Sequence, residues 1–115
     1  MDIAEKHRVC VDALRDFAEE TSATDVVIGL SGGIDSSLVA CLCCDVFGSE
    51  HVHGVLMPGP YSTSHSLIDA QELARALGIE TQQISINEPF QAFGRILSEH
   101  MGGFGGVAAE NTQAR

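Results

Sequence analysis

The segment Asp25–Val46 constrains the fold more than any other part of the chain. It opens with an apolar, β-branched run over residues 25–30, which predicts a buried strand of a parallel sheet. The glycine pair Gly32 and Gly33 then interrupts the extended pattern, and a segment with helical periodicity follows from Leu38. A strand, a glycine turn and a helix in this order predict a βα unit of an α/β fold.

This turn is suited to holding phosphate. Glycines lack the β-carbon that would keep the backbone away from an anion, and the first turn of the following helix presents unpaired N–H groups. The spacing excludes a Walker A loop, which needs a lysine, and the dinucleotide fingerprint GxGxxG. The alternative is a tight turn in which Asp35 or Ser36 caps the helix without binding a ligand.

The rest of the chain repeats the pattern of strand and helix twice. Further strands are expected over residues 51–57 and 79–86, and further helices over residues 67–77 and from Asn87 onwards. Ser64 or Ser66 is expected to cap the helix over residues 67–77. Three successive pairs predict a parallel, right-handed, doubly wound sheet.

An amphipathic helix over residues 3–20 should precede the sheet. Its apolar side is predicted to carry Ile3, Cys10, Leu14 and Phe17, joined by Val11 and Ala18. Cys41, Cys43 and Cys44 crowd the helix after the glycine turn, and we expect small buried thiols rather than metal ligands. His51 and His53 alternate onto one face of the second strand, where we expect solvated side chains.

The charge balance is strongly acidic. Sixteen acidic against six basic residues give a formal charge of −10, which argues against nucleic acid and anionic membranes as partners. An anionic substrate would have to be held by backbone N–H groups and a cation. No apolar run reaches membrane-spanning length and the start of the chain is too polar for a secretory signal, so we expect a cytoplasmic protein with reduced cysteines.

The hexapeptide Ser31–Ser36, SGGIDS, resembles the pyrophosphate loop SGGxDS of the N-type ATP pyrophosphatases at all five fixed positions. The resemblance implies a Rossmann-like fold of the adenine nucleotide alpha hydrolase type. It also implies ATP and Mg²⁺ as cofactors, with the loop around the β- and γ-phosphates and Asp35 on the metal.

Three later stretches narrow the resemblance to NAD⁺ synthetase, and one of them is Leu73-Ala74 with Leu77-Gly78-Ile79. The other two are MPGPYSTS at residues 57–64, followed by Asp69-Ala70, and ENTQAR at residues 110–115. In that family the MPGPYSTS stretch holds adenine and ribose, and the asparagine and arginine of the ENTQAR stretch lie near the deamido-NAD⁺ site at a dimer interface. The implied reaction is attack of the nicotinate carboxylate of deamido-NAD⁺ on the α-phosphorus of ATP, loss of pyrophosphate, and displacement of AMP by ammonia.

The resemblance assigns roles to individual residues. Ser31, Asp35 and Ser36 would be catalytic, and Asp35 would also hold the metal. Nucleotide and substrate would be bound by Gly29, Leu30, Ser31, Gly32, Gly33, Ile34, Asp35, Ser36, Ser37, Leu56, Met57, Ser62, Ser64, Asn111 and Arg115. The implied assembly is a homodimer that takes free ammonia, or ammonia from a separate or fused glutaminase.

Part of the family pattern is absent, because later phosphate-binding lysines have no counterpart and Lys6 is the only lysine. We therefore expect residues 1–115 to form one NAD⁺ synthetase domain that is incomplete at its C-terminus, with residues 102–106 as a flexible glycine-rich loop. Such a chain would not hold a complete active site. The alternatives are another SGGxDS adenylating amide or thiolation synthetase, a non-catalytic module that binds adenine nucleotide, and a fragment that mainly associates with itself.

Overall fold

A computed structural model describes residues 1–101 and residue 113. The predicted loop over residues 102–106 lies outside the described residues, as do Asn111 and Arg115. The extent of the domain stays a prediction.

Three parallel strands form the sheet in the order β1 (Val26–Gly29), β2 (Val52–Leu56) and β3 (Glu80–Gln83). Val26 pairs with Val52, and His53 pairs with Glu80. The crossover helices are α2 (Ile34–Phe47), followed by the short 3₁₀ helix η1 (Ser49–His51), and α3 (Ser64–Leu77).

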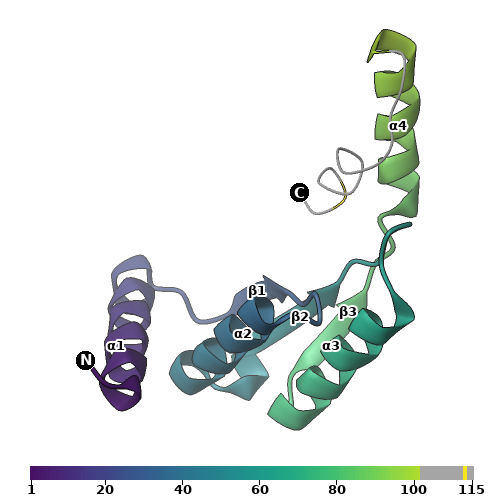
Figure 1. Cartoon of the computed structure of the whole chain (residues 1–115). Coiled ribbons are helices and arrows are strands. Elements are labelled where there is room, and N and C mark those ends of the chain that lie inside the picture. The colour runs from purple at the N-terminus through teal and green to yellow at the C-terminus, as the bar shows by residue number, and fades with distance from the viewer. Residues whose placement is uncertain (102–112, 114–115) are drawn as a thin grey trace.

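Right-handed crossovers that step in one direction place both helices on the same face of the sheet (Figure 1). The expected α/β class with a parallel sheet flanked by helices is confirmed.

The core lies between this face and the two crossover helices. Alanines on the helices let the backbones approach the sheet closely, and Gly54 in β2 leaves room for Leu30, since a Cβ at Gly54 would lie 2.8 Å from Leu30 Cδ1. The buried residues are Leu30, Ala40, Cys43, Val52, Leu56, Ala70, Ala74 and Ile79.

The first helix, α1 (Ile3–Thr21), packs against α2 rather than against the sheet. It buries Val11 and Ala18, whereas Ile3, Cys10 and Phe17 are exposed, so the predicted apolar side was wrong for these three residues. A single neighbouring helix covers only a narrow stripe of a helix surface, which explains the difference.

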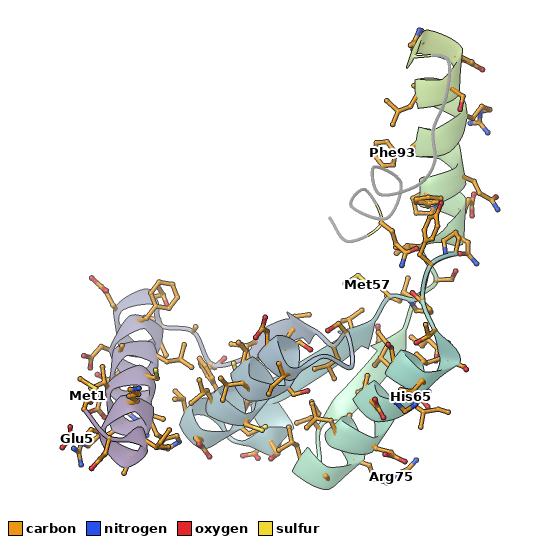
Figure 2. The ribbon with its side chains drawn as sticks, in the orientation of Figure 1. Met1, Glu5, Met57, His65, Arg75 and Phe93 are labelled. Carbon is orange, nitrogen blue, oxygen red and sulfur yellow. The ribbon has the colours of Figure 1, made fainter. Side chains whose placement is uncertain are left out.

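The last helix, α4 (Asn87–Met101), projects away from the sheet (Figure 1). Its Phe93 and Ile96 are 57% and 48% exposed. Figure 2 shows Met57 and Phe93 projecting toward the inner side of the bend between α4 and the sheet. No helix in the described ranges is long and apolar enough to cross a membrane.

The helix ends differ in part from expectation. The N-cap of α2 is Gly33, not Asp35 or Ser36. The N-cap of α3 is Thr63, not Ser64 or Ser66, because the Thr63 hydroxyl accepts a hydrogen bond from the Ser66 N–H at 3.1 Å.

Two histidines meet one carboxylate at the amino-terminal edge of the sheet. Asp25 Oδ1 lies 3.1 Å from His53 Nε2 and 3.2 Å from His51 Nδ1, and Thr24 donates to Asp25 Oδ2 at 2.9 Å. Hydrogen bonds from His53, Thr24 and His51 lower the pKa of Asp25 from 3.8 to about 2. The two imidazoles are therefore hydrogen-bonded to one carboxylate rather than simply solvated, and none of the described residues form a metal-binding cluster.

The prediction of buried thiols in α2 holds for one cysteine of three. Cys43 is buried, Cys41 and Cys44 are half-buried, and all four cysteines, including Cys10 on α1, are free. Burial raises the pKa of the Cys43 and Cys44 thiols, which keeps them in the unreactive protonated form.

Candidate functional site

The turn between β1 and α2 is closed by its own serines. The Ser31 and Ser36 hydroxyls lie 3.0 Å apart, and the Ser31 N–H donates to Ser36 Oγ at 3.2 Å. The Gly33 N–H donates to Ser31 Oγ at 3.1 Å, and the Ser37 hydroxyl donates to the Gly33 carbonyl at 2.7 Å. The residues singled out by the sequence motif are therefore brought together in one loop.

Gly32 has a structural requirement to be glycine. Its φ is +84°, and a Cβ there would lie 2.3 Å from the carbonyl oxygen of Ser66. Both the left-handed conformation and the contact exclude a side chain. The turn is thus pressed against the first turn of α3.

The first turn of α2 offers backbone donors that have no partner among the described residues. The N–H groups of Ile34, Asp35 and Ser36 precede the first intrahelical bond, and the N-cap Gly33 has no side chain that could accept from them. The positive end of the dipole of this 14-residue helix points in the same direction. This arrangement favours an anion held by backbone groups.

Asp35 is exposed in the same turn. No described residue forms a hydrogen bond or an ion pair with its carboxylate. Mg²⁺ is typically held by one or two carboxylates together with substrate phosphates and water. One free carboxylate beside an anion site fits that ion, whereas a site built only of protein ligands would need more groups than the described residues supply.

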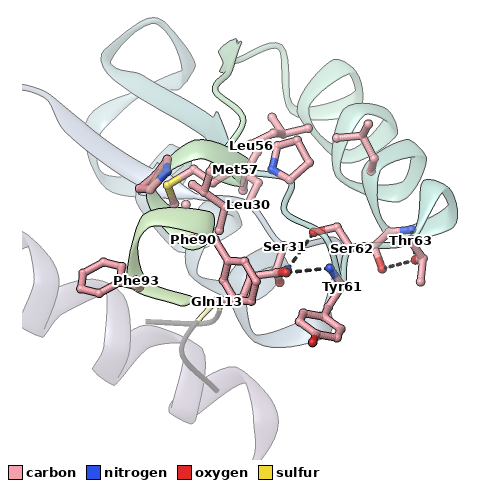
Figure 3. A pocket seen from close by; sticks show the side chains of 16 residues that line it. Leu30, Ser31, Leu56, Met57, Tyr61, Ser62, Thr63, Phe90, Phe93 and Gln113 are labelled. Atoms are coloured by element: carbon pink, nitrogen blue, oxygen red, sulfur yellow. Dashed lines mark hydrogen bonds between the residues drawn. The ribbon is translucent and has the colours of Figure 1, made fainter. Parts of the chain in front are cut away.

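A cavity of about 680 Å³ opens beside the turn, at the carboxyl ends of the strands (Figure 3). This is the position in which open α/β sheets bind ligands, and the volume suits a small molecule. Its walls are mostly apolar, with serines and a glutamine as polar groups. The lining residues are Gly29, Leu30, Ser31, Leu56, Met57, Pro58, Tyr61, Ser62, Thr63, Ser66, Leu67, Ile86, Pro89, Phe90, Phe93 and Gln113.

Six of the residues predicted from the sequence line this cavity, namely Gly29, Leu30, Ser31, Leu56, Met57 and Ser62. Six others, Gly32, Gly33, Ile34, Asp35, Ser36 and Ser37, form the adjoining turn and helix start. Ser64 begins α3 without lining the cavity.

The two predicted backbone contacts to a base differ. The Leu56 carbonyl accepts from the Ile84 N–H at 2.8 Å and continues the ladder to β3. The Met57 backbone makes no hydrogen bond within the described residues and is open to a ligand.

Sequence reasoning missed the aromatic wall and Gln113. Tyr61 and Phe90 stand edge to face with ring centroids 5.7 Å apart, and Phe93 lies one turn further along α4. The spacing of three residues between Phe90 and Phe93 predicts that both lie on the same face of a helix, so this part of the wall could have been found from the sequence. The contact of Gln113 with a loop some fifty residues earlier had no signal in the sequence.

Comparisons with known proteins bear on the same segment. Residues 6–115 match the family model for NAD synthase. The glutamine-dependent NAD(+) synthetase of Thermotoga maritima is 44% identical over 115 residues, which cover 96% of this chain and 19% of that protein.

Two solved structures resemble the fold. The glutamine-dependent NAD⁺ synthetase of Acinetobacter baumannii in complex with ADP superposes with a TM-score of 0.89 at 36% identity, covering 96% of this chain and 21% of that one. The NH3-dependent NAD synthetase of Campylobacter jejuni superposes with a TM-score of 0.83 at 32% identity, covering 99% and 48%. The chain spans between 19% and 48% of the length of these relatives. Because the family model matches residues 6–115, the chain belongs to the NAD synthase family.

Proposed function

We propose that this chain supplies the ATP-holding part of an NAD⁺ synthetase. In the reaction, ATP adenylates the nicotinate carboxylate of deamido-NAD⁺, pyrophosphate leaves, and ammonia displaces AMP to give NAD⁺. The observation that carries the proposal is the serine-closed turn Ser31–Ser37, whose free helix N–H groups adjoin the cavity. The family match favours this reaction over the other SGGxDS synthetases and over a non-catalytic nucleotide module.

The turn would receive the β- and γ-phosphates. Backbone N–H groups that are already aimed at an anion stabilise charge on a leaving pyrophosphate without reorganisation. The serine bonds fix these donors, since Ser31 and Ser36 hold each other at 3.0 Å. With an overall charge of −10, the protein has little other means of attracting a polyphosphate within the described residues.

The adenine would enter the apolar cavity, where the free backbone of Met57 can bond to its edge and the aromatic wall can contact its face. Magnesium bound at Asp35 would neutralise phosphate charge. The relatives carry names of both glutamine-dependent and NH3-dependent enzymes, and either ammonia source is compatible with this part of the site. A homodimer and a cytoplasmic location, where the four free thiols stay reduced, complete the proposal.

The proposal predicts weak binding without turnover. Because the relatives are two to five times longer than the segment they share with this chain, we expect the 115-residue chain to bind Mg·ATP and to release no detectable pyrophosphate with deamido-NAD⁺ and ammonium. Rapid pyrophosphate release by these residues alone would show that the active site is complete.

The role of Asp35 can be tested by calorimetry with ATP in the presence and absence of Mg²⁺. Wild type should bind more tightly with Mg²⁺, and Asp35→Asn should lose that difference. Asp12→Asn on α1 is the control, because Asp12 is exposed and does not line the cavity. An unchanged magnesium dependence in Asp35→Asn would contradict the assignment and favour a simple nucleotide-binding module.

A further inference from the structure

The loop Pro58–Thr63 forms one wall of the cavity, and Gln113 holds it from a distant part of the chain. Gln113 Oε1 accepts from the Tyr61 N–H at 2.7 Å, and Gln113 Nε2 donates to Ser62 Oγ at 3.0 Å (Figure 3). A backbone N–H can only donate, so the atom that faces Tyr61 must be the amide oxygen. The orientation of the side-chain amide is therefore determined by chemistry.

The loop also closes on itself at the residues that Gln113 touches. The Gly59 N–H donates to Ser62 Oγ at 2.9 Å, and the Ser62 N–H donates to the Gly59 carbonyl at 3.0 Å. Ser62 Oγ thus accepts from both Gly59 and Gln113. Tyr61, held at its N–H, contacts Phe90 on α4 across the cavity wall.

Gly59 leaves the space that the Gln113 side chain occupies. A Cβ at Gly59 would lie 2.6 Å from Gln113 Cδ and 2.7 Å from Gln113 Oε1. The φ of Gly59 is not positive, so an alanine would be strained by the glutamine and not by its own backbone.

We propose that Gln113 is a positioning residue, whose side-chain amide holds the loop Pro58–Thr63 in the shape that forms a wall of the cavity. The effect on nucleotide rests on the proposed function, whereas the effect on the loop does not. Since Met57 directly precedes this loop, loss of the amide would loosen both the aromatic wall and the free backbone expected to meet the base.

Tyr61 gives a direct readout. It is the only tyrosine in a chain without tryptophan, so the intrinsic fluorescence reports on this loop alone. Gln113→Ala should increase quenching of Tyr61 by acrylamide, and Ser62→Ala should do the same because it removes the shared acceptor. Gln71→Ala, at an exposed position of α3 that does not line the cavity, should leave quenching unchanged.

A double-mutant cycle isolates the contact. Gly59→Ala should increase Tyr61 quenching in the presence of Gln113 and have little effect in the Gln113→Ala background, where the obstructing atoms are gone. An equal effect of Gly59→Ala in both backgrounds would overturn the proposal, as would wild-type quenching in both Gln113→Ala and Ser62→Ala.

The conservative variant Gln113→Glu separates the effect of Gln113 on the loop conformation from an effect of charge on nucleotide binding. Gln113→Glu keeps an oxygen for the Tyr61 N–H and can accept from the Ser62 hydroxyl, so quenching should return to the wild-type value. Affinity for Mg·ATP should fall about tenfold in Gln113→Ala, from the loss of two hydrogen bonds, and should stay reduced in Gln113→Glu because of its negative charge. If wild type binds no ATP while quenching responds as expected, the proposed function fails and the positioning role stands.

Discussion

At the scale of single residues, Gly32 shows how one backbone angle fixes the candidate site. Its positive φ and its contact with the Ser66 carbonyl are separate constraints. Gly78 has a positive φ of 72° but no atom within 4 Å of an added Cβ. The two glycines therefore share a positive φ and differ in steric contact, which makes their comparison informative.

We predict that Gly32→Ala lowers the free energy of unfolding by about 1–3 kcal/mol more than Gly78→Ala, because only the first forces backbone against backbone. Gly32→Ala should also weaken Mg·ATP binding, since the donors of the turn would shift. Urea denaturation and calorimetry would measure both effects. Equal costs for the two substitutions would show that α3 yields to the added methyl group.

Asp25 is the residue with a defined pH response. Because its pKa is lowered from 3.8 to about 2 in the folded chain, its ionised form stabilises the fold above pH 3.8, and this stabilisation is lost as the pH falls through about 2. We predict that the difference in unfolding midpoint between wild type and Asp25→Asn is present above pH 3.8 and shrinks as the pH falls toward about 2.

Asp16→Asn is the control for that titration, because Asp16 is exposed on α1 and forms no ion pair or hydrogen bond within the described residues. It should show no such loss over the same range. A pH-independent difference for Asp25→Asn would mean that the histidines bond to the asparagine equally well.

At the scale of elements, the start of α3 depends on its N-cap, Thr63, which directly precedes the first residue of the helix. The Thr63 hydroxyl accepts from the Ser66 N–H and donates to Ser66 Oγ at 2.9 Å. Threonine at this position satisfies a donor that the helix leaves unpaired. Since Ser66 also lies against Gly32, the cap supports the turn Ser31–Ser37 as well as the helix.

We predict that Thr63→Ala lowers the free energy of unfolding by about 1 kcal/mol. Ser64→Ala should change it by less than about 0.5 kcal/mol, because the exposed Ser64 side chain makes no hydrogen bond within the described residues. Chemical denaturation of both variants would measure the two changes in the free energy of unfolding. A larger loss for Ser64→Ala would restore the cap position expected from the sequence.

At the scale of the whole molecule, the chain is more extended than a compact domain of its length. Its radius of gyration is 17.1 Å, against about 13 Å for a compact domain of roughly 100 residues. The described helices α2 and α3 cover one face of the sheet, and on the other face Val27 is 73% exposed. Ile84, which follows β3, is 52% exposed, and the strand register places it on that same face.

Exposed apolar residues gathered on one sheet face favour association. We predict that the molar mass from light scattering rises with protein concentration, and that Val27→Lys with Ile84→Lys reduces the rise. Glu72→Lys changes the net charge by the same amount at an exposed position of α3, away from this face, and controls for net charge. A molar mass independent of concentration in wild type would show that this face remains solvated.

The sequence by itself determined the strand, the glycine turn and the helix start, because these depend on local chemistry: β-branched runs, a residue without a Cβ, and the spacing of six residues in SGGIDS. It also indicated the parallel α/β order, which follows from alternating periodicities along the chain. The caps were harder to assign, since Thr63, Ser64 and Ser66 have similar hydroxyls and only the backbone geometry selects one.

Only the tertiary structure decided which side of α1 is buried and that His51 and His53 share Asp25. It also decided that Gln113 forms hydrogen bonds with Tyr61 and Ser62. Each of these contacts joins residues that are distant in sequence. These contacts form only when the helices and strands have packed together, and a local sequence pattern does not determine which residues then come into contact.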